Sequence, residues 1–215
     1  MENLVKIIIY IHAFFGGIGL LAGTAVMFAK KGNQLHAKLG KIFSLGMLIS
    51  SLLSLIICSM PNHHNSFLLM IGIFTIYMIL MGNRVLNYKR KNYENKLDKV
   101  ISGVMFLASI VMIIFGIIPL FTQNSIGILF LIFGGLGAFM AYRDFIFYKN
   151  PERFKKWTNV HVGKMVGAYI ASITAFLVAG AGFGGNLYVW ILPTIIGTFY
   201  IVYWLKKLNK KVVVN

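Results

Sequence analysis

The fold is decided by one uninterrupted apolar stretch, Val100–Phe121, which reads VISGVMFLASIVMIIFGIIPLF. It contains no charged residue, and a helix that rises about 1.5 Å per residue crosses the roughly 30 Å hydrocarbon layer of a bilayer at this length. A membrane-spanning strand needs only about ten residues and alternates polar with apolar positions, which this stretch does not do. The stretch therefore predicts a transmembrane helix.

Six further stretches of the same kind are spread along the chain. They are Val5–Phe28, Lys41–Met60, Ser66–Asn83, Ser125–Tyr142, Val162–Gly182 and Leu187–Leu205. The linkers between them are short, so we expect residues 1–215 to form a single all-α membrane domain of about seven transmembrane helices, with no soluble domain. The first stretch is too long, and too weakly basic at its start, for a cleaved signal peptide.

Composition and charge support this class of protein and exclude others. Of the 215 residues 58% are hydrophobic and 12% charged, and the mean hydropathy is +0.78, whereas an ordinary soluble domain carries roughly a quarter charged residues. The single cysteine, Cys58, excludes an internal disulfide and a CxxC site. The net charge of +16 would suit nucleic acid, but the Lys and Arg residues punctuate the apolar stretches instead of forming a basic stripe. We therefore expect no nucleic-acid partner.

The basic residues also predict an orientation. Lys and Arg gather in residues 30–41, 84–99, 143–164 and 206–211, whereas the connections Pro61–Asn65, Thr122–Asn124 and Phe183–Asn186 contain none. By the positive-inside rule we expect the N-terminus outside and the C-terminus in the cytoplasm. The predicted partners are the lipid bilayer and, on the cytoplasmic side, its anionic headgroups.

Three histidines are the unusual residues in so apolar a chain, because ring nitrogens in lipid need a hydrogen-bond partner or a metal. His12-Ala-Phe-Phe-Gly16 and His36-Ala-Lys-Leu-Gly40 echo each other, and His161 opens the sixth apolar stretch. The predicted topology places His12 in the outer third of the first helix and the other two on the cytoplasmic side. His12 is therefore a separate, outer-side candidate, either a packing hydrogen bond or half of a second site.

A cluster at the cytoplasmic mouth of the bundle is the main candidate site. Asp144 adjoins the fifth apolar stretch, where a carboxylate needs a partner. Arg84, Arg143, His36 or His161 could supply that partner. The predicted ligand-binding or polar cluster consists of His36, Arg84, Asp144, His161 and Lys164. The alternative is that Asp144 and Arg84 are interfacial ion-pair partners that only fix helix register.

Glycines recur on the helix faces that carry two of these histidines. His12, Gly16, Gly19 and Gly23 lie on one stripe, and Gly163-x-x-x-Gly167 follows His161. Small residues at this spacing let another helix approach closely. The stripes predict either plain helix packing within the chain or an oligomer formed through the glycine-rich faces.

The histidine motifs resemble those of a bacterial multi-pass membrane family, domain-of-unknown-function family 2306. The resemblance is carried by His12, Leu35-His36-Ala-Lys-Leu-Gly40-Lys41, Asp144 and His161-Val-Gly-Lys-Met165. Family members typically have His-Arg-x-x-Gly-Arg where this chain has residues 36–41, and His-x-x-Arg-Met where it has residues 161–165. Here Ala37, Lys41 and Lys164 stand at the arginines, which weakens planar bidentate recognition. The resemblance implies a bacterial inner-membrane protein and supports the site. It implies no reaction, because the family has no established activity.

Two functions remain open at this point. The first is transport or binding of a small or lipid-like ligand, which the scarcity of polar residues along the bundle centre favours. The alternative is a transmembrane redox protein that binds haem b between His36 and His161, because paired histidines on neighbouring helices can be axial ligands. The sequence has no serine elbow, no paired carboxylates and no HExxH motif, so it favours a protein without catalytic activity. A hydrolase that uses His161 and Asp144 stays open, although no nucleophile stands out beside them.

Overall fold

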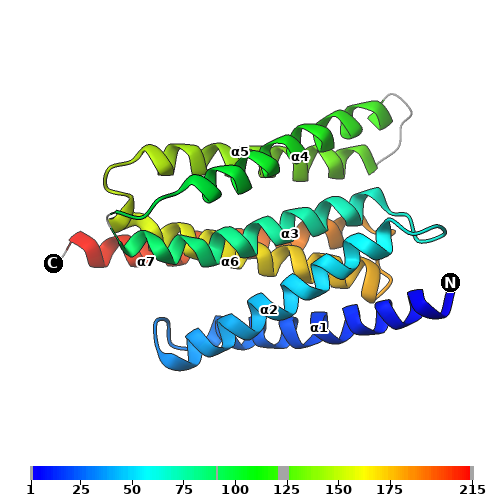
Figure 1. Ribbon diagram of the computed structural model, residues 1–215, viewed down its shortest axis with the longest axis horizontal. Coiled ribbons are helices and arrows are strands. Elements are labelled where there is room, and N and C mark those ends of the chain that lie inside the picture. Colours follow the sequence, from blue (N-terminus) through cyan, green and yellow to red (C-terminus); the bar gives the residue numbers. More distant parts are fainter. Residues whose placement is uncertain (1, 91, 121–125, 214–215) are drawn as a thin grey trace. The chain divides into compact units, whose positions relative to one another are not determined.

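The computed structural model describes residues 2–90, 92–120 and 126–213, and this part of the chain is helical apart from short connections (Figure 1). The elements in chain order are α1 Glu2–Phe28, α2 Gln34–Cys58, α3 Ser66–Arg84, a 3₁₀ segment η1 Val85–Lys89, α4 Lys96–Leu120, α5 Ile126–Lys149, α6 Arg153–Ala175, a π-helical segment η2 Phe176–Gly180, and α7 Leu187–Val213. Within the described residues, seven helices are long and apolar enough to cross a membrane. The predicted all-α seven-helix membrane fold is confirmed. Lys91 and the predicted connection Thr122–Asn124, with its flanking Phe121 and Ser125, lie outside the described residues.

Several helices extend beyond the apolar stretches at their basic ends. α2 begins at Gln34 instead of Lys41, and the Asn33 side chain caps it by accepting the backbone N–H of His36 at 2.8 Å. Hydropathy marks only the segment that lies in hydrocarbon. A helix can continue beyond the hydrocarbon layer at its basic end, because the charged heads of long Lys and Arg side chains reach water there.

The same extension moves two candidate residues into helix interiors. α5 continues to Lys149 instead of ending at Tyr142, and α6 begins at Arg153 instead of Val162. Asp144 was expected at the end of the fifth helix and His161 at the start of the sixth. Both instead lie more than one helical turn inside their helices.

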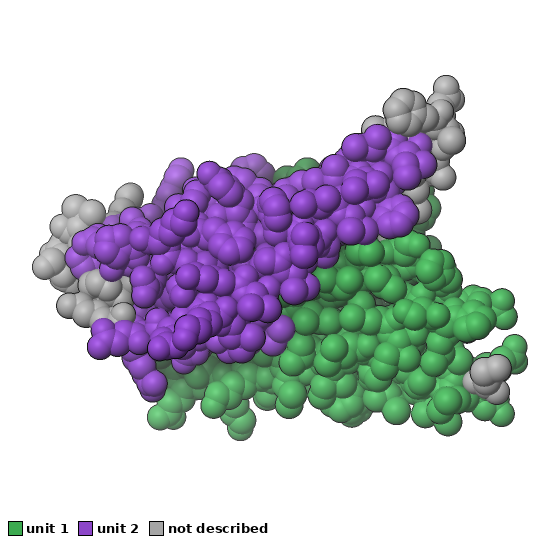
Figure 2. All heavy atoms as spheres, turned by 45° about the horizontal axis from the view of Figure 1, so that its top comes forward, with its two compact units in different colours: residues 1–79, 166–197 green, residues 80–165, 198–215 purple. Residues whose placement is uncertain are grey.

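The chain divides into two compact units, which Figure 2 colours separately. Unit 1 contains residues 1–79 and 166–197, and unit 2 contains residues 80–165 and 198–215. α3, α6 and α7 each begin in one unit and end in the other. Within unit 1, α1 packs along α2, and within unit 2, α4 packs along α5 (Figure 1).

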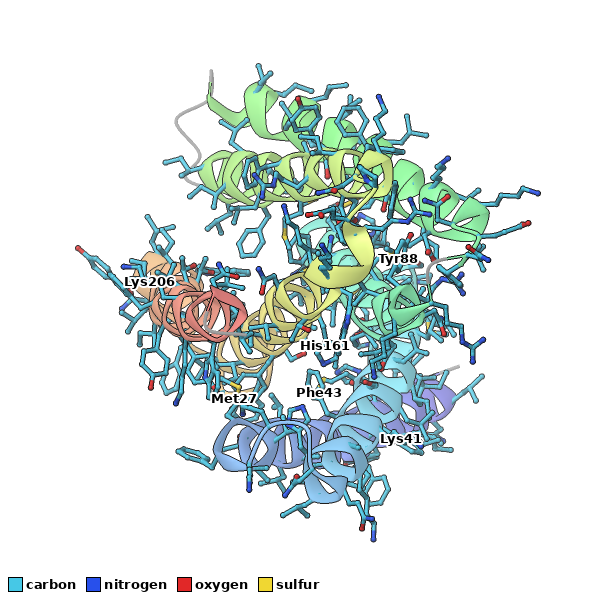
Figure 3. The ribbon with its side chains drawn as sticks, turned by 90° about the vertical axis from the view of Figure 1, so that its left-hand side faces the viewer. Met27, Lys41, Phe43, Tyr88, His161 and Lys206 are labelled. Carbon is cyan, nitrogen blue, oxygen red and sulfur yellow. The ribbon has the colours of Figure 1, made fainter. Side chains whose placement is uncertain are left out.

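Glycines set the close approach of α1 and α2 in unit 1. A Cβ atom added to Gly46 would lie 2.9 Å from the backbone oxygen of Phe15 and 3.1 Å from the Cα of Gly19. A Cβ on Gly23 would lie 2.9 Å from the ring of Phe43, which Figure 3 labels, and 2.7 Å from that of Tyr169. The glycine face of α1 is therefore used for packing within unit 1.

Candidate functional site

A fully buried carboxylate, Asp98, lies in the first turn of α4 in unit 2. The Arg84 guanidinium at the end of α3 donates from Nε to Asp98 Oδ1, and Tyr88 Oη donates to Oδ2 at 2.9 Å. Arg84 also donates from Nη2 to Tyr93 Oη at 2.7 Å. Burial, and after it the negative charge of Asp98, raises the pKa of Tyr93 above its ordinary value. We call Arg84 and Asp98 the outer pair.

A second ion pair joins α5 to α6. Lys164 Nζ donates to Asp144 Oδ2 at 2.8 Å, and only 4% of each side chain is exposed. Ser102 of α4 donates from Oγ to the same Asp144 oxygen at 2.8 Å. Lys164 and Asp144, which we call the inner pair, thus bring three helices of unit 2 together.

Two hydroxyl groups connect the inner pair to the outer pair. Tyr148 Oη lies 2.7 Å from Ser102 Oγ and donates to the backbone oxygen of Asp98 at 3.2 Å. The two ion pairs are therefore parts of one hydrogen-bonded group, which we call the polar network. It consists of Arg84, Tyr88, Tyr93, Asp98, Ser102, Asp144, Tyr148 and Lys164.

Helical spacing places these side chains on facing surfaces of α4 and α5. The buried residues of α4 recur at three- and four-residue intervals: Asp98, Ser102, Met105, Ser109 and Met112. The facing residues of α5 follow the same period, namely Ala141, Asp144 and Tyr148. The polar residues of the two buried stripes meet at Ser102 of α4, whose Oγ donates to Asp144 of α5 and lies 2.7 Å from Tyr148 Oη.

Aromatic rings enclose the outer side of the polar network. The ring centroid of Tyr88, which Figure 3 labels, lies 5.0 Å from that of Phe147 and 4.9 Å from that of Tyr93. The Arg153 guanidinium lies 5.9 Å from the same ring centroid. Tyr88 and Phe147 are buried, so they surround Asp98 with a medium of low dielectric in which electrostatic interactions are stronger than at a surface.

The predicted site residues in unit 2 pair differently from the simplest expectation. Arg84 pairs with Asp98, and the partner of Asp144 is Lys164. Arg143 is exposed. His161 lies 2.7 Å, through Nδ1, from the backbone oxygen of Gly82, to which the ring donates in the tautomer that carries hydrogen on Nδ1. The alternative prediction, that Asp144 and Arg84 pair with each other, is therefore wrong.

His36 belongs to unit 1, where it is the third residue of α2. Its Nδ1 is buried and has no hydrogen-bond partner among the residues that the structure describes. Nearby, Lys31 Nζ donates to the backbone oxygens of Val26 and Met27 at 2.8 Å each and so caps the end of α1. Burial lowers the pKa of this lysine below its ordinary value.

His12, the outer-side candidate, makes a hydrogen bond between α1 and α2 of unit 1. Its Nδ1 lies 2.9 Å from the backbone oxygen of Ser50 and 3.0 Å from Ser50 Oγ, and Ser50 Oγ donates to the backbone oxygen of His12 at 3.1 Å. Gly16, one turn further along α1, leaves room for this contact, because its Cβ would lie 2.9 Å from Ser50 Oγ. The arrangement joins the two helices at one point.

We expect His12→Leu to lower the free energy of unfolding by about 1 kcal/mol, because interhelical hydrogen bonds in membranes contribute about this much. Unfolding in mixed micelles, followed by circular dichroism, measures the change. His63→Leu is the control, since His63 is exposed in the α2–α3 connection. A loss no larger than that of the control would contradict a stabilising role for the His12–Ser50 contact.

Five members of the polar network were not predicted from the sequence: Tyr88, Tyr93, Asp98, Ser102 and Tyr148. Asp98 lies between Lys96 and Lys99, a segment that reads as a charged linker although α4 already begins at Lys96. Helical periodicity is the signal that identifies Asp98, because Asp98 and Ser102 extend the buried stripe of α4 toward its N-terminus by two turns.

No group of three or more His, Cys, Asp or Glu side chains that could hold a metal ion occurs within the described ranges. Comparison of the chain with protein-family models, curated proteins and solved structures finds no match. The resemblance to domain-of-unknown-function family 2306 therefore stays a prediction.

Proposed function

We propose that the protein binds a small or lipid-like ligand at the polar network and carries it across the membrane. The observation that supports this most strongly is the inner pair, whose two charged side chains are each only 4% exposed. Ionisable groups inside membrane helices are costly and characteristically mark ligand or ion pathways. Helix packing alone does not require them, because replacing a buried ion pair by apolar residues is often neutral or stabilising.

The polar network also has a graded exposure that suits an entry route. The side chain of Arg84 in the outer pair is 27% exposed, whereas that of Asp98 is fully buried and those of the inner pair are nearly so. A polar group that enters beside Arg84 meets hydrogen-bonding partners at each step toward Lys164. The route follows Tyr88, Ser102 and Tyr148.

Cations paired with aromatic rings support the placement of this end of unit 2 at a membrane surface. Lys89 Nζ lies 4.6 Å from the ring centroid of Trp157, and Lys207 Nζ lies 5.0 Å from that of Trp204. Trp and Lys side chains are enriched where lipid meets water. We propose that these residues contact anionic lipid headgroups, as the basic fringe of the sequence predicts.

The ligand-binding proposal is tested by thermal unfolding of the purified protein in the presence of a metabolite panel. A ligand at one hundred times its dissociation constant stabilises the folded state by about 2.7 kcal/mol, so it raises Tm. We expect at least one class among organic anions, organic cations, neutral solutes and lysolipids to raise the Tm of the wild type. The double variant Asp144→Leu/Lys164→Met, which keeps an apolar core, should lose that increase.

The matched control is Glu94→Gln, since Glu94 pairs with Lys96 at 3.4 Å on the exposed surface. This variant should respond to the ligand as the wild type does. The proposal is contradicted if no compound raises the wild-type Tm, or if the increase persists in the double variant.

The alternative predicted by the sequence, haem b bound by His36 and His161, has its own readout. Its mark would be a Soret band that shifts when dithionite is added and disappears in His36→Ala or His161→Ala. A colourless wild-type preparation would exclude the haem interpretation. A haem spectrum without any ligand-dependent Tm increase would replace the proposed function by the redox one.

A further inference from the structure

The charges of the polar network cancel, and this balance restricts what can bind there. The network contains two carboxylates, Asp98 and Asp144, and two cations, Arg84 and Lys164, each paired with one of them. The inner pair is almost completely removed from water. A ligand that added a net charge beside it would leave a charge without compensation in a medium of low dielectric, which is strongly unfavourable. A charged ligand must therefore arrive together with a change of protonation.

For an anionic ligand the compensating change is the protonation of Asp144. The Lys164 ammonium and the Ser102 hydroxyl both donate to Asp144 Oδ2, at 2.8 Å each. If the carboxylate of a ligand replaces Asp144 as the acceptor for Lys164, a protonated Asp144 can donate to Ser102 Oγ. Ser102 can then donate to Tyr148 Oη, which lies 2.7 Å away, because a hydroxyl both donates and accepts. Every group of this rearranged site keeps a hydrogen-bond partner.

The opposite change, in which Lys164 loses its proton and a cation binds to Asp144, would also keep the site neutral, but it would release a proton where the first change takes one up. The titratable and charged groups that reach Asp144 directly or through the network include Lys164 of α6, Asp98 of α4, Tyr148 of α5, Arg84 of α3 and Tyr88 of η1. The charge of Asp98 is already matched by Arg84. Lys164 Nζ, which donates to Asp144 Oδ2, is the donor that the carboxylate of a ligand would take over.

The electrostatic field around unit 2 favours an anion. Residues 84–99 and 143–164, which surround the ends of the helices that carry the network, are rich in Lys and Arg. Charge of one sign around a cleft raises the local concentration of ligands of the opposite sign and lowers that of ligands of the same sign. Anions would therefore be concentrated beside Arg84, and cations would be repelled.

We propose that the ligand is a small monocarboxylate, which binds to Lys164 Nζ and is carried together with one proton that Asp144 takes up. This inference rests on the proposed function and names its ligand class. The proton passes from water to the Asp144 carboxylate as the ligand anion binds, so the loaded site has the same net charge as the empty one. A dianion such as phosphate would need a second proton, which the single inner carboxylate does not accept.

The test uses the wild-type chain in phosphatidylcholine vesicles and labelled lactate or pyruvate as the probe. A pH gradient of about one unit, with the vesicle interior more alkaline, should accumulate the probe inside about tenfold. One proton carried per anion makes the concentration ratio of the anion equal to that of the proton. A potassium-diffusion potential without a pH gradient should give no accumulation, since the loaded site carries no added charge. Vesicles without protein correct for passive entry of the free acid.

Variants then assign the proton to Asp144. Asp144→Glu should keep the pH-driven accumulation, Asp144→Asn should abolish it, and Glu94→Gln should match the wild type. Because Asp144→Asn is expected to be less stable than the wild type, proton uptake is also measured on the wild type, where stability is not changed. Addition of lactate to an unbuffered solution of the purified protein should remove about one proton from solution per lactate bound.

Three results would overturn this inference: accumulation driven by the membrane potential alone, lactate binding without proton uptake, or no binding and no uptake of either probe. If the metabolite panel still raises Tm through the inner pair, the proposed function survives such a result and only the ligand class fails. If the panel gives no response, both fail together.

Discussion

Asp144→Asn is expected to lower the free energy of unfolding by about 3–5 kcal/mol, the characteristic loss when one partner of a buried ion pair is removed. The variant leaves the Lys164 ammonium, which is 4% exposed, beside a neutral amide. It also changes the acceptor of the Ser102 hydroxyl. Reversible unfolding of the purified protein in mixed micelles measures the loss.

Two further variants show whether the loss comes from the unmatched charge. Glu94→Gln should change the unfolding free energy by less than about 1 kcal/mol, because the Glu94–Lys96 pair is exposed and such pairs contribute little. The double variant Asp144→Leu/Lys164→Met should recover most of the stability, since it removes both charges. Equal losses for Asp144→Asn and Glu94→Gln would rule out a buried ion pair at Asp144.

Gly46→Leu is expected to lower the free energy of unfolding by about 3 kcal/mol, at the upper end of the cost of overpacking. The added Cβ would lie 2.9 Å from the backbone oxygen of Phe15 and 3.1 Å from the Cα of Gly19. These are backbone atoms, so the contact is relieved only by moving α1 away from α2. That movement would also break the His12–Ser50 hydrogen bond.

Gly40→Leu is the matched control on the same helix, because a Cβ at Gly40 meets nothing within 4 Å. There the substitution should be neutral or stabilising by up to about 1 kcal/mol, since glycine is a poor helix former. A disulfide trapping pair placed across α1 and α2 would report the same separation by cross-linking rate. Similar stability of the two leucine variants would show that α1 and α2 do not approach through Gly46.

The number and type of the elements could be predicted from the sequence, because a membrane helix needs only a long apolar stretch and no knowledge of its neighbours. The ends of the helices could not. α6 begins with Arg153 and Lys155, which hydropathy assigns to a linker, although their side chains can reach water from a continuing helix. The positions assigned to Asp144 and His161 within their helices were wrong for this reason.

The candidate site was predicted in part. Arg84, Asp144 and Lys164 all belong to the polar network, but the sequence could not assign their partners. Which carboxylate meets which cation depends on the rotation and register of α4, α5 and α6 against one another. The burial of Asp98 could not be predicted, because a single acidic residue between two lysines has the pattern of a solvated segment.

The division of the chain into units has a consequence for biosynthesis. Unit 1 needs residues 166–197 in addition to its first 79, so it cannot be completed until residue 197 has left the ribosome. The α4–α5 hairpin of unit 2, in contrast, is available much earlier. During synthesis α1 and α2 must therefore persist in the bilayer as a pair. The glycine contacts at Gly19 and Gly46 can form within that pair alone, so they can hold an early insertion intermediate together while the later helices are still being made.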